Sequence, residues 1–227
     1  MALPTFKPVA DRALLVEFGT DVDDTLNRLV VTLDKAIAAA GIDGLVETVP
    51  ALVNLLVVFD PLATTHTDVQ ASIARLFPMK NMEEVQPKTH IVPVCYDPEL
   101  CPDLLEVAAA KDISVEAVIA AHLSVTLRVS MFGFAPGYAY LSGLPEAIQV
   151  PRKPAAIRGV PTGRVMIAGP QCLITTVVMP TGWSIIGRSA VQIMQNDPDN
   201  PFLFNVGDSV TFERIHRDAL PADMQTP

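Results

Sequence analysis

Length, composition and charge already exclude several kinds of protein. The chain has 227 residues, half of them hydrophobic, and a formal net charge of −9. This length suits one large domain or two small ones, and the hydrophobic fraction requires a large core or a buried subunit interface. The acidic balance argues against nucleic acid as a partner, because binding to nucleic acid needs a basic face.

The cysteines and the N-terminus indicate a cytoplasmic protein. Cys95, Cys101 and Cys172 are odd in number and lack Cys-x-x-Cys spacing, so we expect reduced thiols. The N-terminus has no basic flank, long apolar run or cleavage site, so no signal peptide is expected. Residues 165–187 are uncharged, but their prolines, glycines and short β-branched runs predict buried strands instead of a membrane-spanning helix.

The first part of the chain alternates strands and helices. We predict strands at 13–18, 45–49, 52–59 and 90–95, a helix capped by Asp21 that ends at Gly41, and a helix capped by Thr67 or Asp68 that ends before Pro78. The order strand, helix, strand, strand, helix, strand is the split βαβ, ferredoxin-like plan.

The second part begins with two short helices and is then almost entirely strand and turn. The helices are predicted at 102–110 and, capped by Ser114, at 115–123; the second has no Lys or Arg that could contact DNA phosphates. The predicted strands are 125–132, 138–141, 164–168, 172–179, 183–186, 190–194 and 209–215. Many short strands with glycine and proline turns favour a closed barrel. Residues after Arg217 are expected to form a frayed tail.

Basic residues are concentrated in the barrel half. Residues 117–196 contain six Lys or Arg and a single acid, Glu146. This is either a solvated basic face or a pocket for a carboxylate or phosphate, which the guanidinium fork suits. Arg152 and Arg158 flank a proline-stiffened loop, and Arg188 follows Gly187 at a strand end, so each is either a surface charge or an anion ligand.

An aromatic turn runs from Met131 to Pro145. It holds three glycines, two prolines and four aromatic residues and carries no charge. Gly137 can adopt backbone angles that other residues avoid, and Pro136 fixes its own φ. The segment is either a tight turn between core strands or a rigid pocket wall, in which Phe134, Pro136 and Tyr138 would contact substrate.

This turn resembles the motif of a family that comprises the B subunit of 5-oxoprolinase, also called allophanate hydrolase subunit 1, and a bacterial sporulation-kinase inhibitor. The motif is close to G-F-x-P-G-F-x-Y-L-x-G-L-P, and Gly133–Pro145 matches it with Tyr138 for the usual Phe. The resemblance continues through Pro151-Arg152, Arg158, Val160-Pro161-x-Gly163, Ala168-Gly169-x-Gln171, Gly182-Trp183, Gly187-Arg188 and Gly207-Asp208.

The resemblance implies an α+β protein with two domains: ferredoxin-like over 1–88, and a cyclophilin-like β-barrel over 89–220, with a tail at 221–227. It implies one component of an ATP-dependent amidohydrolase, inactive alone, which works with a larger related C subunit (allophanate hydrolase subunit 2) and an A subunit. ATP would act at the level of the complex, because the chain has no P-loop. The alternatives are a carboxyltransferase half acting on urea or an amide, and a non-catalytic inhibitor of a sensor histidine kinase.

Most catalytic mechanisms that have a recognisable sequence motif are excluded, because the motifs are missing. The chain has no Gly-x-Ser-x-Gly elbow, no His-Glu-x-x-His or similar metal cluster, and no second acid near Glu146 for a carboxylate pair. His122, at the end of a helix, is either bonded to the last carbonyls or a proton donor or acceptor in the pocket, as the resemblance suggests. Gln171 is either a strand-tying amide or a substrate ligand.

Three places depart from the family pattern. Residues 172–181 lack the usual Gly-Ile-Tyr-Pro and Ser-Pro-Gly, the usual Gly-Ser is Gly163-Arg164, and the usual Thr-Pro after Gly-Arg is Ser189-Ala190. We therefore expect the barrel to be kept while the substrate differs.

Overall fold

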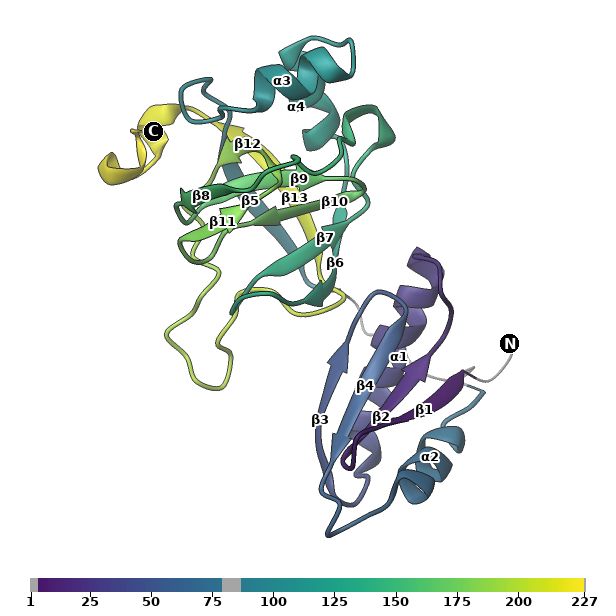
Figure 1. Ribbon diagram of the computed structural model, residues 1–227. Coiled ribbons are helices and arrows are strands. Elements are labelled where there is room, and N and C mark those ends of the chain that lie inside the picture. The colour runs from purple at the N-terminus through teal and green to yellow at the C-terminus, as the bar shows by residue number, and fades with distance from the viewer. Residues whose placement is uncertain (1–3, 79–86, 227) are drawn as a thin grey trace. The chain divides into compact units, whose positions relative to one another are not determined.

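A computed structural model describes residues 4–78 and 87–226. The chain divides into two compact units, Met1–Gln86 and Pro87–Pro227 (Figure 1). Each unit has its own sheet and its own hydrophobic core.

The N-terminal unit is a four-stranded antiparallel sheet with two helices. Its elements are β1 (Thr5–Val9), β2 (Ala13–Glu17), α1 (Asp24–Ala40), β3 (Leu45–Pro50), β4 (Asn54–Phe59) and α2 (His66–Ala74). The strands lie in the order β1-β2-β4-β3, and every neighbouring pair is antiparallel. The helices pack their apolar faces against the sheet, with Leu33, Ile37 and Ile73 fully buried.

Both predicted helices are confirmed, but each begins at a different cap. The side chain of Asp23 accepts hydrogen bonds from the N–H groups of Thr25 and Leu26 at 2.6 and 3.0 Å, so α1 is capped there and not at Asp21. Thr65 caps α2 in the same way, in place of Thr67 or Asp68. Gly41 ends α1 with φ of +60°, a left-handed conformation that favours glycine.

The predicted ferredoxin-like strand order is wrong in one respect. The strand over 90–95 exists as β5 (Thr89–Cys95), but it belongs to the second unit and pairs with β12 (Ser184–Arg188) and β13 (Ser209–Ile215). The fourth strand of the N-terminal sheet is instead β1, which was not predicted. Its side chains are mostly exposed, so the hydrophobic pattern that reveals a half-buried strand is absent.

The C-terminal unit is built on a closed seven-stranded barrel. Between β5 and β12 come α3 (Leu104–Ala110), α4 (Val115–Leu123), β6 (Leu127–Phe132), β7 (Ala139–Ser142), β8 (Ile157–Val160), β9 (Arg164–Ala168), β10 (Gln171–Ile174) and β11 (Met179–Thr181), and the unit has 3-10 turns at Glu146–Ile148, Arg217–Ala219 and Ala222–Met224. The barrel order is β10-β7-β6-β13-β5-β12-β9. The first and last strands of the unit, β5 and β13, pair in parallel over seven residues. Pairing of β9 with β10 closes the ring, so the predicted closed barrel is confirmed.

Several strand predictions in this unit are corrected. The segment 190–194 is not a strand, and only Met194 forms an isolated bridge, with Phe202. The predicted strand 172–179 is two strands, β10 and β11, because the chain turns at 175–178. The proline-rich stretch contains β8, which pairs with β11 as a small separate sheet. This sheet contributes Val160 and Met179 to a second apolar cluster, which also contains Trp183.

The C-terminal residues are packed and not frayed. Leu220 is buried, Met224 packs against the barrel core, and Arg217 donates to the Gln225 carbonyl at 2.6 Å and pairs with Glu99. The uncharged stretch 165–187 forms strands and turns as predicted. Within the described residues, no helix has the length and apolar character needed to cross a membrane.

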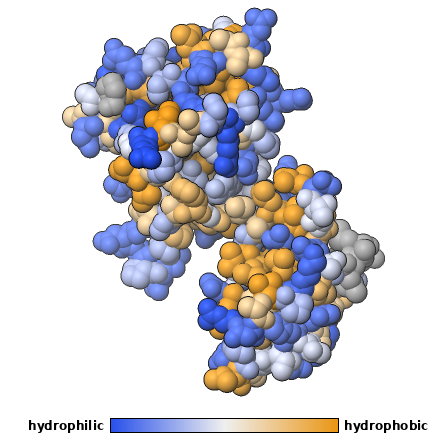
Figure 2. Space-filling view, in the orientation of Figure 1, coloured by the Kyte–Doolittle hydropathy of each residue, from blue (hydrophilic) through white to orange (hydrophobic). Residues whose placement is uncertain are grey.

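Part of the hydrophobic content lies at the surface. Figure 2 shows hydrophobic residues on the visible face of each unit. Large side chains that are strongly exposed include Leu62, Leu105, Phe134 and Val178, with exposed fractions from 68% to 96%. Exposed apolar residues of this size are compatible with a binding partner.

Candidate functional site

The aromatic turn between β6 and β7 is fixed by its own hydrogen bonds. Gly133 donates to the Tyr138 carbonyl at 3.2 Å, and Tyr138 donates to the Ala135 carbonyl at 3.1 Å. The hydroxyl of Thr176 donates to the Pro136 carbonyl at 2.7 Å, which ties the turn to the loop between β10 and β11. Phe134 has φ of +70° and is 73% exposed. A strained, exposed aromatic residue at a rigid turn is a feature that functional sites retain.

Aromatic rings continue from this turn in a row. The ring centroids of Phe134–Tyr138, Tyr138–Tyr140 and Tyr140–Trp183 are 5.5, 5.4 and 5.9 Å apart. The guanidinium carbon of Arg152 lies 5.5 Å from the centroid of Trp183, a cation–π contact. Trp183 and Tyr138 are each 4% exposed, and burial raises the pKa of Tyr138. The row therefore forms a rigid wall with one exposed end and a cation at the other.

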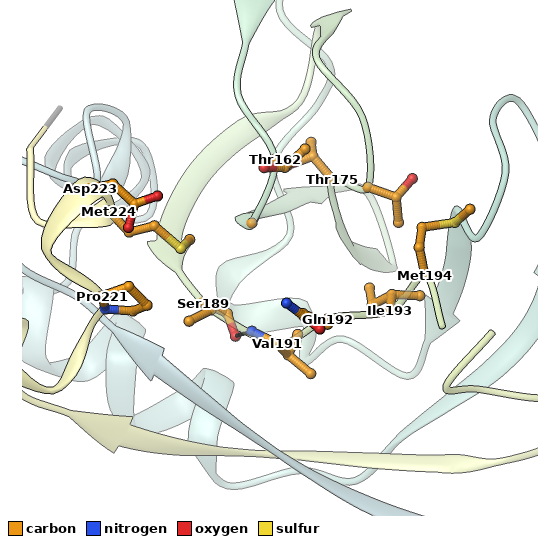
Figure 3. A pocket seen from close by; sticks show the side chains of 13 residues that line it. Thr162, Thr175, Ser189, Val191, Gln192, Ile193, Met194, Pro221, Asp223 and Met224 are labelled. Carbon is orange, nitrogen blue, oxygen red and sulfur yellow. Dashed lines mark hydrogen bonds between the residues drawn. The ribbon is translucent and has the colours of Figure 1, made fainter. Parts of the chain in front are cut away.

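A cleft of about 570 Å³ opens beside this turn. Its walls are residues 162–163, 175–176, 189–194 and three residues of the C-terminal segment, Pro221, Asp223 and Met224. In Figure 3, Asp223 and Met224 face the cleft from the opposite side to Met194, and Ser189 and Gln192 lie between them. The volume is within the range typical of small-molecule pockets.

Two buried arginines adjoin the cleft. Arg188 and Arg164 are direct cross-strand partners on β12 and β9, and are 6% and 5% exposed. Their chain neighbours Ser189 and Gly163 line the cleft. Burial lowers the pKa of both guanidinium groups, and the charge of Arg188 lowers the pKa of Arg164 further. Arg164 was not among the predicted site residues, although the local excess of basic residues includes it.

His122 lies in the core with its ring nitrogens against Tyr96 and Cys172, unlike either sequence alternative, a pocket group or a helix-end histidine bonded to the last carbonyls. It is fully buried: the Tyr96 hydroxyl lies 2.7 Å from Nδ1, the Cys172 sulfur lies 3.5 Å from Nε2, and Phe212 stacks on the ring at 4.3 Å. Burial lowers its pKa to about 3, so the imidazole is neutral at physiological pH. Burial raises the pKa of Cys172, which is a fully buried core thiol. A ring without access to solvent cannot exchange a proton with substrate.

The remaining predicted ligands lie on different elements of the C-terminal unit, outside the cleft. Arg152 and Arg158 are exposed, Arg152 over Trp183 and Arg158 on β8. Gln171 is half-buried at the start of β10, opposite Ala168 and Ser142. None of these three predicted ligands lines the cleft, and neither do Phe134, Pro136 or Tyr138. The cleft is thus lined by none of these predicted ligands, although Thr176 of its wall is bonded to Pro136 in the aromatic turn.

A match to a family model shows which protein family this chain belongs to. The model described as carboxyltransferase domain, subdomain C and D, matches residues 4–204. The chain belongs to this family. It is similar to the B subunit of 5-oxoprolinase from Bacillus subtilis (strain 168), with 31% identity over 221 residues and 91% of each chain covered. It is also similar to the B subunit of 5-oxoprolinase from Escherichia coli O157:H7, with 33% identity over 169 residues, 74% of this chain and 77% of that one.

Solved structures of similar proteins agree with the fold. The protein TTHA0988 is 32% identical with a TM-score of 0.81; the match covers 92% of this chain but 41% of TTHA0988, so this chain spans about two fifths of that protein. The conserved uncharacterized protein PH0987 from Pyrococcus horikoshii is 36% identical, with a TM-score of 0.56 and coverage of 94% and 99%. The Kluyveromyces lactis urea carboxylase, at 18% identity, TM-score 0.75 and coverage of 96% and 22%, shares the fold.

The three departures from the family motif lie around the same cleft. Thr175 and Thr176, in the changed stretch 172–181, line it. So do Gly163, which precedes Arg164, and Ser189-Ala190. These positions are far apart in sequence, and the barrel brings them together. The cleft wall therefore includes or adjoins residues from each of these three places.

Proposed function

We propose that this chain is the B-type component of an ATP-dependent amidohydrolase of the 5-oxoprolinase kind. The reaction would open 5-oxo-L-proline to L-glutamate, with ATP converted to ADP and phosphate. The observation that carries this proposal is the similarity to the Bacillus subtilis B subunit of 5-oxoprolinase over nine tenths of both chains. Such coverage includes both structural units, so the likeness does not depend on a shared barrel alone.

We propose further that the chemistry is shared with other subunits. His122 is sealed in the core, and Glu146 is the sole acid between residues 117 and 196. The sequence contains no P-loop, so ATP would be bound at the level of the complex, with a larger related C subunit and an A subunit as partners. The exposed apolar side chains supply surface for such an assembly. The free, buried cysteines fit a reducing cytoplasm.

In this proposal, the aromatic row binds the cyclic amide. Phe134 and Pro136 provide an exposed apolar face, Tyr138 supports it from the buried side, and Arg152 is held over Trp183 at the far end of the row. Arg152 and Arg158 would contact the substrate carboxylate, and Gln171 its amide. Rigid aromatic surface with a nearby cation suits a small, flat anion, because little side-chain entropy is lost on binding.

A carboxyltransferase half-reaction on urea or an amide is the second candidate. It is favoured by the matching family description, which names a carboxyltransferase domain.

The test is an assay of the co-expressed complex. The chain is produced with the subunits encoded beside its gene, and glutamate and ADP are measured after addition of 5-oxoproline and ATP. We expect glutamate release that requires ATP and every subunit, with none from the chain alone. The control is the same preparation without this chain. An assembled complex that leaves 5-oxoproline intact but carboxylates urea or another amide would overturn the hydrolase in favour of the second candidate.

A further inference from the structure

Two arginine side chains lie next to each other on the outer side of the barrel wall. Arg164 and Arg188 are directly opposite on antiparallel strands, which places their Cβ atoms about 5 Å apart on one face. Val165 and Ile167 of β9 belong to the barrel core, so strand alternation turns Arg164 and its partner outward. Both arginines are nonetheless at least 94% buried, because other segments cover this face.

Neither guanidinium has a counter-ion in the part of the chain that the structure describes. Nε of Arg164 and both Nε and Nη1 of Arg188 are buried and have no hydrogen-bond partner among residues 4–78 and 87–226. Arg164 does donate through Nη1 to the carbonyl of Leu100. No carboxylate of the same residues forms an ion pair with either arginine.

Two buried carboxylates of this unit, by contrast, are well satisfied. Asp103 pairs with Lys153 and accepts from the N–H of Ile185 at 2.7 Å. Asp208 pairs with His90 at 2.9 Å and accepts from two backbone N–H groups. Arg164 and Arg188 differ from these satisfied pairs, because they are two adjacent cations without a carboxylate partner. Such an arrangement costs stability, because desolvation and like-charge repulsion are not compensated.

The cleft adjoins the pair along the chain. Gly163 and Ser189, the chain neighbours of the two arginines, line it. Asp223 lines it from the C-terminal segment (Figure 3), and its negative charge partly opposes the lowering of the pKa of Arg188. Asp223 is nevertheless too far away to form an ion pair with Arg188. The cleft therefore adjoins the backbone that carries both arginines, and Asp223 brings one charge of its wall within electrostatic range of Arg188.

We propose that Arg164 and Arg188 form a binding site for a small oxyanion, a carboxylate or a phosphate, which enters through the cleft beside Asp223. Two guanidinium groups offer unpaired N–H donors to two oxygens of one anion, the geometry in which arginine binds best. Asp223 weakens the site by like-charge repulsion. The site does not depend on the proposed hydrolase activity, because it rests on the burial of the two arginines, their missing partners and the adjoining cleft.

The experiment follows the melting temperature of the full chain, with Trp183 fluorescence as the signal from the C-terminal unit. Sodium phosphate replaces sodium chloride at constant ionic strength. We expect the melting temperature to rise by about 5–10 °C at a hundredfold excess over the dissociation constant. A parallel titration with 5-oxoproline distinguishes the sources: a larger shift there identifies a carboxylate site, and a larger shift with phosphate identifies a phosphate site.

Two variants test whether these arginines are responsible. Arg188→Met should melt above the wild type in chloride, because an unpaired buried charge is removed, and should not respond to either anion. The same change at Arg12, which is exposed in the other unit, should keep the wild-type response. A wild type whose melting temperature neither anion raises would overturn the proposal, as would an Arg188→Met protein that responds as the wild type does.

A third variant keeps the test informative if Arg188→Met fails to fold. Asp223 is exposed, so Asp223→Asn leaves the core untouched while removing the repelling charge. The dissociation constant of the preferred anion should fall about threefold or more. Asp218→Asn, the same change at an exposed site nearby in sequence, should leave it unchanged. Equal affinity in the wild type and Asp223→Asn would place the anion away from this cleft and overturn the proposal.

Discussion

The burial of His122 predicts a specific loss of stability in acid. Its pKa is about 3 in the folded protein and 6.5 when unfolded, so below pH 6.5 the unfolded chain binds a proton that the folded chain does not. Stability therefore falls as pH falls from 6.5 towards 3. Since each pH unit is worth about 1.4 kcal/mol, His122 alone should lower the free energy of unfolding by about 2 kcal/mol between pH 8 and pH 5.

The assay is urea unfolding at both pH values, followed through Trp183, which is the sole tryptophan and lies buried in the C-terminal unit. In His122→Asn the side-chain amide can still form a hydrogen bond with the Tyr96 hydroxyl, but the stacking on Phe212 is lost. We expect this variant to be about 2–4 kcal/mol less stable than the wild type at pH 8. At pH 5 the difference should shrink by about 2 kcal/mol, because asparagine does not titrate.

Two comparisons make the result decisive. His216→Asn, at an exposed position, should retain the wild-type loss between pH 8 and pH 5. A stability difference between wild type and His122→Asn that stays constant with pH would show that His122 is not held neutral by burial. In the assembled complex, His122→Asn should keep its rate per folded molecule; a loss of about a hundredfold without any change in melting would restore the catalytic hypothesis.

Three other predictions follow from the same structure. Gly163→Ala should be destabilised by about 3 kcal/mol or more, because φ is +76° and an added Cβ would collide with the Ser189 carbonyl oxygen. The control Gly169→Ala, at φ of +52° with open space around it, should cost about 1 kcal/mol. Equal melting temperatures of the two variants would refute the close approach at Gly163. Arg152→Ala and Arg158→Ala should each weaken substrate binding to the complex about tenfold, measured by titration calorimetry, and unchanged binding in both would leave them as surface charges. The chain and its larger partner should elute together in size-exclusion chromatography, with an interface on the order of 2,000 Å² or more; a chain that stays monomeric beside its partner and turns over alone contradicts this.

The elements with a clear local pattern were predictable from the sequence. The apolar residues of α1 recur at helical spacing, and Val30, Leu33 and Ile37 are all buried against the N-terminal sheet. The uncharged stretch 165–187 was identified as strands because its β-branched runs are too short and too interrupted for a helix. Family membership was also predictable, because the motif residues from Gly133 to Pro145 stand together in the chain.

Strand pairing was harder to predict, because the hydrophobic pattern of a strand does not specify which other strand pairs with it. β5 was correctly predicted as a strand but assigned to the wrong sheet, and its true partner β13 lies more than a hundred residues further along the chain. β1 was missed, since an edge strand with exposed side chains shows no alternation. The segment 190–194 has the composition of a strand, yet it lines the cleft without a ladder of its own.

Sequence by itself determined the motif, the family and the excess of arginine in the barrel half. Only the tertiary structure decided where each of those residues lies and what surrounds it. Arg164 and Arg188 are 24 positions apart, and the register between β9 and β12 makes them neighbours. His122 resembles a site histidine in the sequence, but packing against Tyr96, Cys172 and Phe212 removes it from solvent. Burial and register arise from contacts between distant segments, so no local pattern can reveal them.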